Sequence, residues 1–98
     1  MALETFSTNP ELFEERAEML KALAHPVRLC IVRGLVEKGA SNVTNMYNCL
    51  NMPQSTISQH ISKLKSSGII KGTRSGLEIS YEVTNPLVIE IINALFGE

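Results

Sequence analysis

The chain has 98 residues, of which 44% are hydrophobic, and a formal net charge of −1. This length suits one domain over residues 1–98 with a compact core. A domain of this size is only modestly stable alone, so further apolar surface would tend to be covered by a partner chain. No apolar run approaches the ~18 residues of a membrane span. We find no secretory signal at the N-terminus, so we expect a cytoplasmic protein whose two cysteines, Cys30 and Cys49, stay reduced.

Charge is distributed unevenly along the sequence. Residues 1–20 hold five Glu and one Arg, whereas residues 54–76 hold three Lys, one Arg and no acidic residue. The net charge alone argues against a nucleic-acid partner, but the distribution of charge matters more than its sum. The segment 54–76 is therefore a candidate basic surface.

Apolar residues recur at helical spacing in the N-terminal part of the chain. After a flexible segment, residues 1–9, we expect helices over residues 11–24, 26–38, 42–50 and 54–67. His25-Pro26 separates the first two, because the residue before a proline is driven out of the helical conformation. Gly39 ends the second helix, and a short turn over residues 51–53 separates the third from the fourth.

The spacing changes to an alternation beyond Gly68. Apolar and polar residues alternate over residues 77–83, which predicts a strand that buries Leu77, Ile79, Tyr81 and Val83. Residues 69–74 are its expected partner, joined through a tight turn at Ser75-Gly76. Thr84-Asn85-Pro86 then precede a last helix, residues 87–96.

The predicted order of elements is α-α-α-α-β-β-α, a mainly α fold with a small β-hairpin. Helices 42–50 and 54–67 have the spacing of a helix-turn-helix over residues 42–67, and the hairpin 69–83 has the length of a wing. In such folds the second helix enters the major groove with its N-terminal part at the bases. We therefore predict a dimeric winged helix-turn-helix protein that binds double-stranded DNA.

The face of helix 54–67 opposite its apolar stripe carries hydroxyls, an amide and a cation, and no carboxylate. Gln hydrogen-bonds adenine, and Ser and Thr reach base edges or phosphates; the other interpretation is an ordinary solvated face. With the wing cations, the expected DNA-binding residues are Gln54, Ser55, Thr56, Ser58, Gln59, His60, Ser62, Lys63, Lys71 and Arg74.

Three of these residues have a second interpretation. His60 lies at the edge of the apolar stripe, where a partly buried structural histidine is the alternative to a phosphate contact. Arg74, beside the predicted turn, and Lys71 are either phosphate contacts of the wing or solvated surface residues.

Two stretches, Leu23-Ala24-His25-Pro26-Val27-Arg28-Leu29 and Pro53-Gln54-Ser55-Thr56-Ile57-Ser58-Gln59-His60-Ile61, resemble the signature segments of ArsR/SmtB-family repressors. The resemblance extends over residues 11–97 and is closest to the PagR-like branch, which lacks metal sites. It implies a winged-helix homodimer that represses transcription by occupying an operator.

The resemblance does not bring a metal site with it. Metal-sensing members carry a Cys-x-Cys pair on the third helix, where this sequence has Asn42 and Thr44. Others place Asp and His ligands on the last helix, which offers Glu90 and Asn93 here. The two Cys and two His are scattered, whereas a soft metal requires them clustered. We therefore predict no metal and no cofactor.

The last helix is apolar on nearly every side. Because such a helix needs cover all round, we expect the segments 11–24 and 87–97 to form a two-fold interface. The alternative is a helix enclosed in one deep core. The expected interface residues are Leu12, Phe13, Leu20, Val88, Ile91, Ile92, Leu95 and Phe96.

Other functions find less support in the sequence. An enzyme would need a nucleophile and a base, and Cys30 with His25 or His60 matches no catalytic signature. A protein-interaction module without DNA binding, acting as an anti-repressor or dimerisation partner, fits the mild acidity of the chain. Cys30 and Cys49 are either redox-sensitive thiols, with Arg33 near Cys30, or small apolar fillers.

Overall fold

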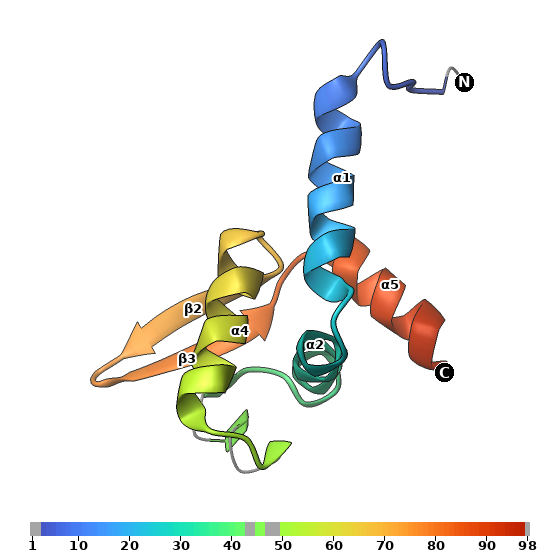
Figure 1. The fold of residues 1–98 in the computed structure, drawn as a ribbon. Coiled ribbons are helices and arrows are strands. Elements are labelled where there is room, and N and C mark those ends of the chain that lie inside the picture. The colour runs from blue at the N-terminus through green and yellow to red at the C-terminus, as the bar shows by residue number, and fades with distance from the viewer. Residues whose placement is uncertain (1–2, 43–44, 47–49, 98) are drawn as a thin grey trace.

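In the computed structural model, residues 3–42, 45–46 and 50–97 are described. Within them, the fold consists of four helices and a three-stranded antiparallel sheet, whose β2–β3 hairpin projects to one side of the molecule (Figure 1). The helices are α1 (Pro10–Leu23), α2 (Pro26–Lys38), α4 (Gln54–Ser66) and α5 (Pro86–Phe96), and the strands are β1 (Ser41–Asn42), β2 (Ile70–Ser75) and β3 (Glu78–Val83). This architecture confirms the predicted winged helix-turn-helix fold.

The predicted third helix is described only in part. Asn45, Met46 and Leu50 are helical, and the backbone N–H of Asn45 donates to the side chain of Asn42 at 2.8 Å. Val43 and Tyr47, which we expected on its apolar stripe, lie outside the described residues.

Local side-chain caps and glycines mark the ends of the helices. The side chain of Asn9 accepts the N–H of Leu12 at the start of α1, and that of Asn85 accepts the N–H of Leu87 at the start of α5. Gly39 ends α2 with a φ of 86°, a left-handed conformation that suits glycine. Asn51, with a φ of 54°, makes the turn before α4.

The hairpin turns one residue later than the sequence predicted. Ser75 pairs with Glu78, which leaves Gly76 and Leu77 as a two-residue loop. Gly76 has a φ of 66°, the positive value that tight hairpin turns require. As a result Leu77, which we expected on the buried face, is 101% exposed at the wing tip.

A third strand, β1, was not predicted. Ser41 pairs with Tyr81 and Asn42 with Ser80, so the sheet has the order β1-β3-β2. Two polar residues carry no alternation that sequence reasoning can use, because their strand character comes only from pairing with β3.

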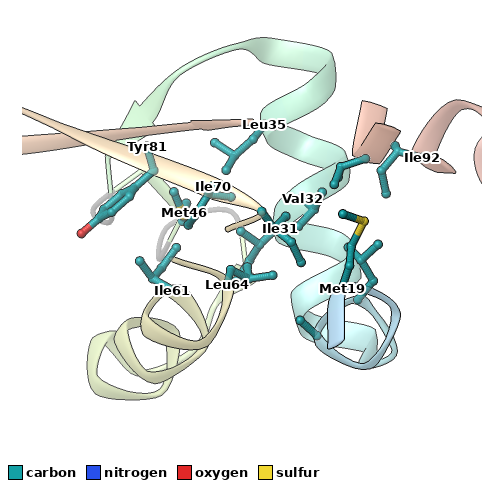
Figure 2. Packing of buried hydrophobic residues seen from close by; sticks show 14 of the residues in the cluster. Met19, Ile31, Val32, Leu35, Met46, Ile61, Leu64, Ile70, Tyr81 and Ile92 are labelled. Carbon is teal, nitrogen blue, oxygen red and sulfur yellow. The ribbon is translucent and has the colours of Figure 1, made fainter. Parts of the chain in front are cut away.

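One apolar cluster joins α1, α2, α4, α5 and the base of the hairpin (Figure 2). It includes Met19 from α1, Val32 from α2 and Leu64 from α4. Val88 and Ile92 of α5 also belong to it, at 0% and 2% exposed. We therefore correct their expected place in a dimer interface: both are already covered by their own chain.

The N-terminal segment, predicted to be flexible over residues 1–9, forms a turn where it is described. The backbone N–H groups of Thr8 and Asn9 donate to the carbonyl of Thr5 at 3.1 and 2.8 Å. Phe6 packs edge-on against Phe13 of α1, with ring centroids 6.3 Å apart. Among the described residues, no helix is long and apolar enough to cross a membrane.

Close packing between the two wing strands generates a stability prediction. A Cβ at Gly72 would lie 2.9 Å from Cε1 of the buried Tyr81 ring and 3.2 Å from Cγ2 of Ile79. We expect Gly72→Ala to lower the free energy of unfolding by about 1–3 kcal/mol, because the ring has to move out of a packed site. Urea denaturation measures the change. The exposed neighbour Thr73→Ala is the control, and an equally small effect of both variants would contradict the prediction.

Candidate nucleic-acid interface

Helix α4 presents its polar face outward because its apolar face is buried. Ile57, Ile61 and Leu64 lie on one side of the helix and are almost fully covered by the core. Gln59 and Ser62, on the other side, are exposed. The first turn of α4 carries no acidic residue, and its last turn carries Lys63 and Lys65, so no carboxylate of the helix opposes an approaching phosphate.

The N-terminus of α4 is open to an incoming ligand. Its N-cap position is Pro53, which provides no side-chain hydrogen bond to the helix. The first backbone N–H groups of a helix have no intrahelical acceptor and carry partial positive charge. The carbonyl of Pro53 accepts from Thr56 and Ile57 at 3.1 and 3.2 Å, so the earlier N–H groups of the first turn are the ones available to an anion.

All ten residues predicted to bind DNA lie within the described part of the chain. Thr56 and His60 are half-buried, and the other eight are exposed. Those eight are Gln54, Ser55, Ser58, Gln59, Ser62, Lys63, Lys71 and Arg74. Figure 1 shows the hairpin extending beside α4, so the wing cations and the helix belong to neighbouring parts of the molecule.

The two wing cations, Lys71 and Arg74, face different residues on the neighbouring strand. Lys71 lies directly across from the acidic residue Glu82, whereas Arg74 lies across from the apolar residue Ile79. Glu78, near the wing tip, accepts a hydrogen bond from Nδ2 of Asn42 at 2.6 Å. That carboxylate is held on the β1 side of the sheet, opposite to β2, and Arg74 is the stronger phosphate-binding candidate.

His60 lies against α2 and its N-cap residue. Its Nδ1 is 3.5 Å from Nη1 of Arg28, and its ring centroid is 4.6 Å from that of His25. Burial, followed by the nearby His25 and Arg28, lowers the pKa of His60 below its ordinary value. This placement agrees with the structural interpretation of His60. Sequence reasoning missed the role of Arg28, although it lies in one of the two signature stretches.

The remaining predicted features have mixed outcomes. Cys30 is exposed on α2, and Cys49 lies outside the described residues, so their proximity is untested. Arg33, which the redox interpretation placed near Cys30, pairs with Glu37 at 3.5 Å and lies 4.6 Å from the ring centroid of Phe96. In the described ranges, no three His, Cys, Asp or Glu side chains are grouped as metal ligands.

Comparison with known proteins assigns the family. A family model described as a helix-turn-helix domain matches residues 23–73. The transcriptional repressor PagR of Bacillus anthracis is 48% identical over 82 residues, which cover 84% of this chain and 82% of PagR. The repressor SmtB of Mycobacterium tuberculosis is 37% identical over 90 residues, covering 90% of this chain and 66% of SmtB. The chain belongs to the ArsR/SmtB family of repressors.

Solved structures of other repressors share the fold. The crystal structure of PagR matches with a TM-score of 0.80 at 47% identity, covering 85% of this chain and 94% of that one. The repressor BigR of Xylella fastidiosa matches with a TM-score of 0.80 at 34% identity, covering 95% and 94%. This ArsR/SmtB-family protein is therefore a DNA-binding transcriptional repressor and not an enzyme.

The position of Asn42 generates a prediction about metals. The resemblance described above places a cysteine of the metal-sensing members at this position, whereas here the side chain accepts from Asn45 and donates to Glu78. We expect zinc, cadmium or arsenite at micromolar concentration to leave this repressor on its DNA, because an amide engaged in two hydrogen bonds is a poor ligand for soft metals. Fluorescence anisotropy with each ion, and with chelator as the control, measures retention. Release with a fixed metal stoichiometry would refute this expectation.

Proposed function

We propose that this repressor binds an imperfect palindromic operator as a homodimer, with one α4 in the major groove of each half-site. The exposed face of α4 supports this most directly, because it carries hydroxyls and an amide and no carboxylate. Two helices related by a two-fold axis read a palindrome whose half-site centres lie about one helical turn, ~10 bp, apart or slightly more.

Base reading and phosphate binding fall to different residues. Ser55, Thr56 and Gln59 lie in the N-terminal half of α4, which is the part of a recognition helix that contacts the bases. Gln59 is fully available to hydrogen-bond an adenine, whereas Thr56 is half-buried and offers only part of its side chain. Lys63 and Arg74 are exposed cations that neutralise phosphates without regard to sequence.

The proposed dimer uses α1 and α5. Phe13 and Leu20 on α1 are 42% and 54% exposed in the single chain, and Leu95 and Phe96 on α5 are 60% and 40% exposed. Figure 1 shows both helices at the side of the molecule away from the wing tip. A partner packing there would cover these four apolar side chains and leave α4 and the wing free for DNA. Leu12 and Ile91, both half-buried, complete the proposed interface.

Repression needs no chemistry in this scheme. Where the operator overlaps a promoter, a bound dimer excludes RNA polymerase by occupying the same DNA. The operator itself is identified by incubating the protein with fragments of its own genome and sequencing those that it retains.

Two substitutions test the division of roles. We expect Gln59→Ala to keep non-specific binding and to lose about 1–3 kcal/mol of preference for the correct base. We expect Arg74→Ala to weaken binding to every sequence and to lower the salt dependence by about one unit of slope for each phosphate that it no longer neutralises. Titrations on operator and scrambled DNA at several salt concentrations measure both. Lys71→Ala is the matched wing control, with a smaller effect because Glu82 lies across from Lys71.

The same titrations can reject the proposal. Operator binding by Gln59→Ala and Arg74→Ala that equals wild type would mean that α4 and the wing are not the reading surface. A wild-type protein with no preference among genomic fragments would favour the interaction-module function instead.

The dimer is tested separately by light scattering at micromolar concentration. We expect wild type to have twice the 10.8 kDa mass of one chain. Leu95→Glu should return the monomer mass, because a carboxylate cannot be buried unpaired in an apolar interface. Leu77→Glu is the matched control: the same change at the wing tip should leave the dimer intact. A wild-type mass of one chain would end the dimer proposal.

A further inference from the structure

Arg28 connects three helices at one point. Its Nε donates to the backbone carbonyl of Ala22, at 2.6 Å, and its Nη2 donates to that of Lys21, at 3.5 Å, so it satisfies carbonyls at the end of α1. Its Nη1 lies 3.5 Å from Nδ1 of His60 in the middle of α4. The Arg28 side chain on α2 thus contacts both α1 and α4, the helix proposed to face DNA.

His25 packs beside His60 and also accepts a hydrogen bond through its Nδ1. Its Nδ1 accepts the backbone N–H of Val27 at 3.1 Å, which caps α2 and requires that this nitrogen carry no proton. Its ring packs on that of His60 with an interplanar angle of 46°. Both histidines therefore meet a donor through an unprotonated Nδ1.

Protonation of His60 would reverse this interaction. Arg28 has only donors, so His60 can bind it only as an acceptor. An imidazolium would offer a second donor and would put two positive charges at contact distance. The link between α2 and α4 would then break, and repulsion would replace it.

We propose that Arg28 is a positioning residue for α4, that it acts through neutral His60, and that acidification weakens operator discrimination by breaking this link. The proposal rests on α4 being the reading helix, as proposed above. His60 lies next in sequence to Gln59, so a shift of α4 at this position moves the residue proposed to read a base.

The groups around His60 determine at which pH its contact with Arg28 breaks. Burial acts on the pKa of His60 first, and the neighbouring titratable His25 and the Arg28 guanidinium act in the same direction. From α1, the backbone carbonyl of Lys21 accepts from Arg28, and the ammonium of Lys21 pairs with Glu18 at 3.4 Å. From β2, neither Lys71 nor Arg74 contributes. Because the folded-state pKa lies below 6.5, the link is intact at neutral pH and breaks as the pH falls through that lowered value.

The test is the ratio of operator affinity to scrambled-DNA affinity, measured from about pH 8 to about pH 5.5, the range in which histidine titrates. The ratio cancels the general gain in phosphate attraction that any protonated histidine brings. We expect a fall of roughly tenfold in wild type, the size of one broken hydrogen bond to a charged group. Circular dichroism restricts the comparison to pH values at which the protein is folded.

Three variants separate positioning from a merely structural role. His60→Asn keeps an acceptor near the Nδ1 position but cannot titrate, so its ratio should change with pH much less than that of wild type, whatever its value at pH 8. Arg28→Lys keeps the charge but has a single donor group, and should lower the ratio at pH 8. Lys38→Gln, at the far exposed end of α2, is the control and should follow the wild-type profile.

Two results would overturn the proposal. One is a wild-type ratio that is high at pH 8 and stays constant into the acid range while the protein remains folded. The other is a His60→Asn profile that falls as the wild-type profile does. A wild type with no operator preference at any pH would instead reject the proposed function, so the two failures are distinguishable.

Discussion

The burial of Ile57, Ile61 and Leu64 is the interaction on which the rest of the interface depends. These residues recur over successive turns on one side of α4 and lock the rotation of the helix about its own axis. Successive residues lie ~100° apart around a helix axis, so a rotation of the helix about that axis would expose a different set of side chains. The apolar packing therefore determines that Gln59 and Ser62 face outward, although neither side chain takes part in it.

Electrostatic separation explains how a chain with a net charge of −1 presents a surface suited to DNA. Four of the ten carboxylates lie on α1, while residues 54–76 contain none. Surface charges farther apart than a Debye length, about 8 Å at physiological salt, are largely screened from each other. Local composition around α4 and β2 thus matters more than the total. The wing shows the same effect at short range, where the facing residue distinguishes Lys71 from Arg74.

Sequence reasoning located the elements whose residues carry a local signal. Pro26, Gly39 and Asn85 mark helix ends within about a residue of their observed positions, because caps act on the backbone beside them. Strand β1 and the true position of the hairpin turn depend on which residues pair across the sheet, and pairing has no local signature. Periodicity also marked α5 as apolar but did not distinguish its inner face, which holds Val88, from its outer face, which holds Leu95.

The two hydrogen bonds of Asn42 have a mechanical consequence. One joins it to Asn45, where the helix-turn-helix begins, and the other joins it to Glu78 of the wing. With Ser80 paired to Asn42 as well, the wing and the start of the helix-turn-helix share a common anchor. A template whose two elements share an anchor adjusts less readily to a groove of the wrong width than two independent elements would. DNA sequences that bend easily, or whose groove narrows easily, would fit it at a lower deformation energy. Base pairs that the protein does not contact would then influence its affinity.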